Sequence, residues 1–218
     1  QAEDMAHLAS LGYKAFKFRV WRPDPMDDVE IVRQTRARLG GPDVVELMLD
    51  RTGDAPGEDW DDATGLRVAD ALYEEGAQWL EEPFVRGDIE RHAKLRAATR
   101  IPITGGEHQP LDVYDDYLQG QSFDIIQPHC ANVLLHLKKI AGAAELFGVD
   151  CIFHGSHGMD LLGSLQIGAT IPSCRLQEVV YTTPPTPPTD AWSPLNALVN
   201  TDSILTIEEG YAAIPDAP

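Results

Sequence analysis

The chain has 218 residues, of which 43% are hydrophobic, and its 35 acidic against 17 basic residues give a net charge of −18. This is enough apolar material for one large α/β domain or two small ones. So large an acidic excess leaves no basic surface for nucleic acid or an anionic membrane, and we therefore expect small molecules and metal ions as partners.

The cysteines and the first residues favour a reducing compartment. Cys130, Cys151 and Cys174 are odd in number and lack CxxC spacing, which argues against a disulfide framework and against a zinc site. No apolar run reaches membrane-spanning length, and the chain does not start with the basic flank and apolar core of a signal peptide. We expect a cytoplasmic protein that is not associated with a membrane.

Strand and helix patterns alternate along the chain, as in right-handed βαβ units on a parallel sheet. Helices are predicted over residues 3–11, 26–39, 61–76, 87–98, 110–119, 133–147 and 158–170. Strands are predicted over residues 14–20, 44–50, 79–84, 102–107, 123–128, 150–154 and 176–181. The remaining segment, 182–218, begins with a proline-rich stretch and contains one short apolar run near 204–207, so we expect it to pack against something outside this chain.

Seven strands of this kind suit either a doubly wound open sheet or a barrel. A barrel is favoured because acids, bases and histidines follow nearly every strand, around a whole ring rather than at one switch point. An eight-stranded barrel needs one more strand, which we expect before residue 1.

Three of the predicted strands end on an acid: Asp50, Glu81 and Glu107. For one isolated Glu-Glu pair, a solvated position at the end of a strand is the commoner explanation. If the three strands are parallel neighbours, however, their carboxyl ends lie on one rim and the carboxylates converge there. Three convergent carboxylates repel each other without a cation, which indicates a hard divalent metal.

Basic residues and histidines flank the same rim. In strand 14–20 apolar and basic side chains alternate, so Lys17 and Arg19 lie on one face and two phenylalanines lie on the other. A parallel strand covered by helices has no solvated face, so we expect the two cations to point into the barrel near the rim. Four of the seven histidines follow strand ends, and imidazole suits proton transfer near neutral pH: His108, His129, His154 and His157. The other three lie on predicted helices and are expected at the surface: His7, His92 and His136.

Several motifs together resemble the catalytic barrel of the mandelate racemase/muconate lactonizing enzyme branch of the enolase superfamily. They are Gly12-Tyr13-Lys14-Ala15-Phe16-Lys17-Phe18-Arg19, Leu49-Asp50, Trp79-Leu80-Glu81-Glu82-Pro83 and Gly106-Glu107. The resemblance implies an α/β fold, a modified TIM-type (β/α)7β barrel over residues 1–181. It also implies an N-terminal α+β capping domain and a first barrel strand, both absent from this chain, with residues 182–218 packing on the capping domain.

The resemblance further implies roles for single residues. Asp50, Glu81 and Glu107 would be the ligands of Mg²⁺, with Mn²⁺ as a possible substitute. Lys17, Arg19, His154 and His129 would be the catalytic residues. His108 and His157 would contact a small-molecule carboxylate substrate, and the full-length protein would be a homo-oligomer.

Two positions depart from the family pattern. Members with a Lys-x-Lys pair carry a base on the second lysine, whereas this chain has Arg19, which suits a carboxylate clamp better than a base. The aspartate that usually partners the histidine at His154 is replaced by His129, which can orient His154 by hydrogen bonding but supplies no negative charge.

The implied chemistry is Mg-dependent abstraction of the proton α to a carboxylate, with stabilisation of the resulting enediolate. With Arg19 in place of one base, one-sided chemistry is favoured, and we expect dehydration of a sugar acid, an aldonate or aldarate. A cycloisomerase, a racemase or epimerase of a related acid, and a non-catalytic metal- or ligand-binding barrel are the alternatives.

Overall fold

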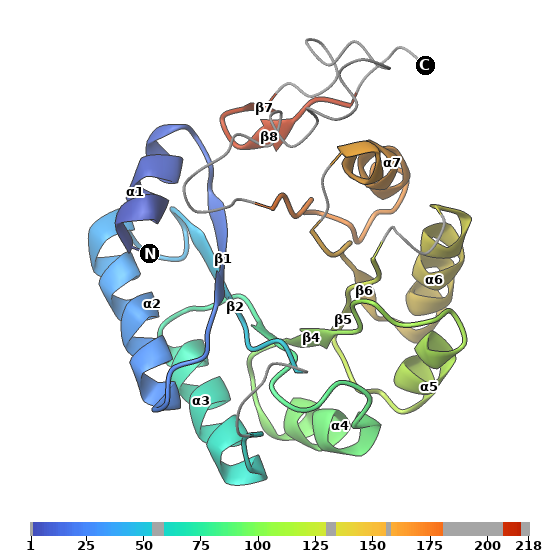
Figure 1. Ribbon diagram of the computed structural model, residues 1–218, viewed down its shortest axis with the longest axis horizontal. Helices are drawn as coiled ribbons and strands as arrows, with labels where there is room; N and C mark the ends of the chain where they lie inside the picture. The colour runs from blue at the N-terminus through green and yellow to red at the C-terminus, as the bar shows by residue number, and fades with distance from the viewer. Residues whose placement is uncertain (1, 54–58, 130–133, 156–157, 181–206, 215–218) are drawn as a thin grey trace. The chain divides into compact units, whose positions relative to one another are not determined.

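A computed structural model describes the whole chain except residues 1, 54–58, 130–133, 156–157, 181–206 and 215–218 (Figure 1). The helices are α1 (Ala2–Ser10), α2 (Pro25–Leu39), α3 (Asp62–Glu74), α4 (Ile89–Ala98), α5 (Val113–Gln119), α6 (Leu134–Phe147) and α7 (Gly158–Gly168). The strands are β1 (Ala15–Arg19), β2 (Glu46–Asp50), β3 (Leu80–Glu81), β4 (Ile103–Gly105), β5 (Ile125–Ile126), β6 (Asp150–Cys151), β7 (Ile207–Glu208) and β8 (Tyr211–Ala212). The predicted βα alternation is confirmed through α7, with shorter strands than expected.

The chain divides into two compact units, residues 1–105 with 116–124 and residues 106–115 with 125–218. In the first unit, β1, β2, β3 and β4 are parallel neighbours in sequence order. Their registers place Arg19, Asp50, Glu81 and Thr104 in one row across the four strands. Side chains in such a row point to the same face of a sheet and stand about 4.8 Å apart from strand to strand.

Burial follows the strand period in this unit. Phe16 and Phe18 of β1 are buried, whereas Lys17 between them is half-buried and Arg19 is exposed. Polar residues cap the helices that cover the strands: Asp61, for example, caps α3 by accepting a hydrogen bond from the backbone N–H of Thr64, 2.7 Å away. Helices α2, α3 and α4 lie along one side of the strands β1–β4 (Figure 1).

In the second unit, β5 and β6 are parallel, and α6 packs against both β6 and α7. The predicted strand 176–181 is wrong over its described part, where Val179 alone makes a bridge. Further along the chain, β7 and β8 form an antiparallel hairpin. Its two-residue turn is Glu209 and Gly210, both with positive φ. Ala212 of that hairpin packs with Val179 against Leu161 and Leu165 of α7.

The predicted packing of residues 182–218 on a capping domain stays a prediction, since most of that segment lies outside the described residues. Of the cysteines, Cys151 is buried and Cys174 half-buried, both as free thiols, and Cys130 is not described. None of the described helices combines the length and apolar composition that crossing a bilayer requires.

Candidate active site

In the first unit, two cations of β1 face two strand-end acids. Lys17 Nζ donates to both carboxylate oxygens of Glu81, at 2.9 and 2.7 Å. Arg19 donates from Nε and a terminal nitrogen to Asp50 Oδ2, at 3.2 and 3.0 Å. The acids are almost fully buried, with 2% of Asp50 and none of Glu81 exposed, so these cations compensate charges that water does not reach.

Both acids have further donors that hold their oxygens in place. Thr52 donates its backbone N–H and its hydroxyl to Asp50 Oδ1, at 2.7 and 2.9 Å, and Trp79 Nε1 donates to Glu81 Oε2 at 3.3 Å. Thr52 has φ of 53°, which is rare for a β-branched residue. Backbone held in that region commonly marks a functional site, because the surrounding structure must compensate the strain.

The second acid of the Glu81-Glu82 pair has a separate environment. Glu82 is 1% exposed, has φ of 43°, and accepts three hydrogen bonds of 2.6 to 2.9 Å from Arg86. The backbone N–H of Gly53 also donates to Glu82, at 3.2 Å. Glu82 therefore ties the loop after β2 to the segment after β3, a positioning role that sequence reasoning missed although the four-residue spacing to Arg86 was a signal.

In the second unit, the third acid contacts a histidine. Glu107 is 4% exposed, and its Oε2 lies against Nε2 of His154, whose side chain is 14% exposed. The backbone N–H of His154 donates to the carbonyl of Pro128 at 3.1 Å. The sequence suggests His129 as the partner that orients His154, and the structure adds a carboxylate of the same unit, Glu107, as a further contact of this imidazole.

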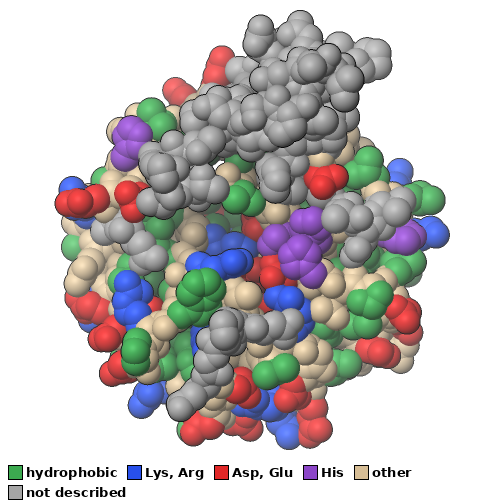
Figure 2. Space-filling view, in the orientation of Figure 1, with side chains coloured by type: hydrophobic (Ala, Val, Ile, Leu, Met, Phe, Trp, Pro, Cys, Tyr) green, Lys and Arg blue, Asp and Glu red, His purple; other side chains and the backbone are tan. Residues whose placement is uncertain are grey.

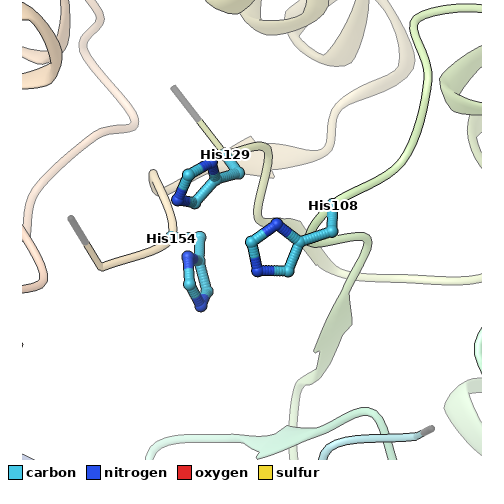
Figure 3. A group of neighbouring side chains, drawn as sticks. All are labelled: His108, His129 and His154. Carbon is cyan, nitrogen blue, oxygen red and sulfur yellow. The ribbon is translucent and has the colours of Figure 1, made fainter. Parts of the chain in front are cut away.

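Three strand-end histidines gather in the same unit: His108, His129 and His154. Their ring centroids are 4.5 Å apart for His108 and His129 and 5.0 Å apart for the other two pairs. Histidine side chains form a visible group on one face (Figure 2), and the three rings turn toward a common space (Figure 3). Burial lowers the pKa of His129, and the neighbouring His154 and His108 lower it further.

The sequence also predicts a substrate contact for His157 and a surface position for His92. His157, predicted to contact substrate, lies outside the described residues. The surface position predicted for His92 is wrong: it is fully buried, with ring centroids 5.5 Å from Phe84 and 4.9 Å from Phe123.

A further acid emerges from the segment predicted as the last strand. Glu178 accepts a hydrogen bond from Gln127 Nε2 at 3.0 Å and another from the backbone N–H of Gly155 at 2.8 Å. It thus connects the segments that follow β5 and β6. Its signal in the sequence was a single carboxylate beside the apolar residues Val179 and Val180.

The parallel βα units and the likeness to solved structures described below show an α/β barrel of the TIM type. The chain belongs to the enolase C-terminal domain-like family, whose model matches residues 1–218. The resemblance seen in the sequence is thereby confirmed.

Two curated relatives illustrate what the chain is similar to. It is 28% identical over 151 residues to 3,6-anhydro-alpha-L-galactonate cycloisomerase of Streptomyces coelicolor, covering 68% of this chain and 40% of the relative. It is 30% identical over 123 residues to L-talarate/galactarate dehydratase of Salmonella typhimurium, covering 56% of this chain and 29% of the relative. The chain thus matches less than half the length of either relative.

Solved structures share the fold. A mandelate racemase/muconate lactonizing enzyme-like protein from Roseovarius sp. TM1035 has a TM-score of 0.80 at 24% identity, covering 100% of this chain and 54% of that one. L-talarate dehydratase from Polaromonas sp. JS666, complexed with Mg and L-glucarate, has a TM-score of 0.78 at 24% identity, covering 98% and 54%.

Proposed function

We propose that the protein containing this chain removes the proton α to the carboxylate of a sugar acid with the help of Mg²⁺, and dehydrates an aldonate or aldarate. The observation that carries the proposal is the pairing of two cations of β1 with the buried acids that end β2 and β3: Arg19 with Asp50, and Lys17 with Glu81. Cations beside buried acids at strand ends suit an anionic substrate held next to a metal ion.

Asp50, Glu81 and Glu107 are the proposed Mg²⁺ ligands. Each is a strand-end carboxylate that is at most 4% exposed, and an all-oxygen donor set is the one that Mg²⁺ prefers. Asp50 and Glu81 are register partners in one unit, and the inclusion of Glu107 rests on the family match. When bound, Mg²⁺ supplies positive charge that stabilises the negative charge developing on the substrate carboxylate.

Arg19 and His154 have different roles in the proposal. The Arg19 side chain is 48% exposed and its guanidinium stays charged, so it can turn toward a substrate carboxylate and bind it through two N–H groups. His154 moves the proton, either by taking it from the α-carbon or by giving one to the departing β-hydroxyl. In the second case Lys17 takes the α-proton, after its hydrogen bonds to Glu81 are broken.

Loss of the α-proton and of the β-hydroxyl releases water and leaves an enol, which tautomerises to an α-keto acid. A cycloisomerase or a racemase would begin with the same proton abstraction, and one similar protein is a cycloisomerase. A dehydratase is preferred because Arg19 stands where a second base would be needed for racemisation.

The test is hydrogen exchange at the α-carbon. The intact protein with Mg²⁺ is incubated in deuterated water with a panel of aldonates and aldarates, and loss of the α-proton signal is followed by NMR together with product formation. We expect exchange with at least one acid, and His154→Asn is expected to abolish either exchange or product formation while Mg²⁺ binding survives.

The matched variant is Arg19→Lys, which keeps the charge but removes the planar pair of donors. It should lower the rate of dehydration without creating a racemase. Full activity of both variants, or no exchange with any acid, would contradict the proposal and favour a non-catalytic binding barrel.

A further inference from the structure

The group formed by His108, His129 and His154 offers three imidazole nitrogens that lie within 4.8 Å of one another. The histidines come from three segments, after β4, after β5 and after β6, and all belong to the second compact unit. Their rings turn toward one space rather than away from each other (Figure 3). Three histidines that only happened to lie near one another would not need to share this orientation.

The electrostatics of the group favour the neutral form of His129. Three charged rings at this spacing would repel each other, and burial together with the two neighbours lowers the pKa of His129. A neutral imidazole presents a lone pair, which is the form that binds a metal ion. Asp160 and Glu107 add negative charge near His129, and this charge favours a cation.

His154 has one nitrogen available for such a bond. Its Nε2 contacts Glu107, whereas its buried Nδ1 has no hydrogen-bond partner among the described residues. A carboxylate on the far nitrogen of a metal-bound histidine is the usual arrangement, because it fixes the ring orientation and makes the other nitrogen a better donor.

We propose that His108, His129 and His154 form a second metal site, which binds a divalent transition metal ion such as Zn²⁺. Three neutral nitrogen donors select Zn²⁺ over Mg²⁺, which requires oxygen ligands. With Zn–N bonds of about 2.05 Å, the nitrogens around a tetrahedral Zn²⁺ are about 3.3 Å apart. The imidazole nitrogens here lie within 4.8 Å of one another, so they must approach each other by up to about 1.5 Å when the ion binds. The exposed side chain of His108 leaves a fourth position open to water.

Occupancy of this site would remove His154 from proton transfer. This consequence rests on the proposed function, but the site itself does not, because metal binding is measured without turnover. Zn²⁺ at the three histidines would therefore inhibit the Mg²⁺-dependent reaction.

The experiment titrates Zn²⁺ by calorimetry into the intact protein, without an affinity tag and in saturating Mg²⁺, and repeats the titration with Co²⁺ while recording visible absorption. We expect one ion per chain and the absorption of four-coordinate Co²⁺. His108→Asn is the decisive variant: His108 has φ of 55°, which asparagine tolerates, so the backbone is kept while a ligand is lost. His129→Ala removes a second ligand.

Each variant should weaken Zn²⁺ binding at least tenfold, or about 1.4 kcal/mol. His7→Asn, an exposed change on α1, should leave it unchanged, and circular dichroism checks that every variant is folded. No Zn²⁺ binding in the presence of Mg²⁺, or equal affinity in the wild type and His108→Asn, would overturn the proposal. Either result would leave α-hydrogen exchange intact, so the two proposals fail separately.

Discussion

Two adjacent glutamates at the end of β3 show how far neighbouring residues can differ in role. Glu81 accepts hydrogen bonds from the flexible ammonium of Lys17, which a substrate or metal can displace. Glu82 is bound by the guanidinium of Arg86 and by a backbone N–H of the loop after β2. Glu81 can therefore take part in metal or substrate binding, whereas Glu82 holds two loops in place.

The assignment of Glu107 leads to a prediction at this scale. Glu107→Gln keeps the shape of the side chain but removes the charge that a hard cation needs, so Mg²⁺ affinity, measured by calorimetry on the intact protein, should fall at least tenfold, by about 1.4 kcal/mol. Glu90→Gln, an exposed change on α4, is the control. Unchanged affinity in Glu107→Gln would remove Glu107 from the metal site.

His92 leads to a prediction about stability. Burial lowers the pKa of His92 to about 4, whereas an unfolded chain takes up the proton near pH 6.5. Because the unfolded state binds the proton more readily, this group lowers the free energy of unfolding as the pH falls from 6.5 toward 4, and it has no effect above that range. The loss at pH 4.5 should be about 2 to 3 kcal/mol.

The measurement is urea unfolding of the wild type and His92→Phe at pH 7.5, 5.5 and 4.5. The variant keeps an aromatic ring beside Phe84 and Phe123 but cannot titrate, so it should lose less stability on acidification. Equal losses in the two proteins would show that His92 is not protonated on unfolding.

At the scale of elements, two helical glycines have opposite surroundings. A Cβ at Gly65 of α3 would lie 2.7 Å from Cζ of the buried Phe84, whereas a Cβ at Gly142 of α6 would meet no atom within 4 Å. Gly65 therefore allows α3 to approach the segment after β3 closely. At Gly142 no neighbouring atom requires the absence of a side chain.

Gly65→Ala should destabilise the protein by about 1 to 2 kcal/mol, because overpacking exceeds the gain in helix propensity. Gly142→Ala should stabilise it by up to about 1 kcal/mol through the same propensity. Thermal unfolding should show the two midpoints moving in opposite directions, by about 2–4 °C per kcal/mol. A shift in the same direction would mean that the contact with Phe84 does not limit the approach of α3.

At the scale of the whole molecule, the net charge of −18 sets the response to salt. Many arginines are paired with acids, such as Arg91 with Asp59 and Asp62, and salt weakens these exposed pairs slightly. The unpaired acidic excess is larger, and its self-repulsion opposes the compact state.

Raising NaCl from 10 to 150 mM at pH 7.5 shortens the Debye length from about 30 to about 8 Å and should raise the unfolding midpoint by a few degrees. Near pH 4.6, the isoelectric point of the sequence, the same salt step should have little effect. A lower midpoint in salt at pH 7.5 would show that ion pairs, not repulsion, dominate.

The sequence by itself determined the order of strands and helices, the strand-end positions of Asp50, Glu81 and Arg19, and the place of Lys17 on the same strand as Arg19. These follow from local chemistry: hydrophobic period, caps and glycine or proline stops act within a few residues, and parallel strands bring their carboxyl ends to one edge. The family motifs added the prediction of a barrel, because each motif lies on or directly after a different predicted strand.

Only the tertiary structure decided the partners and the depth of each side chain. His92 has the sequence surroundings of a surface helix residue but is covered by Phe84 and Phe123. His154 contacts the carboxylate of Glu107 as well as the ring of His129. The segment 176–181 has the composition of a strand, yet its described part forms one bridge, at Val179. Burial and pairing depend on residues distant in the chain, so no local pattern determines them.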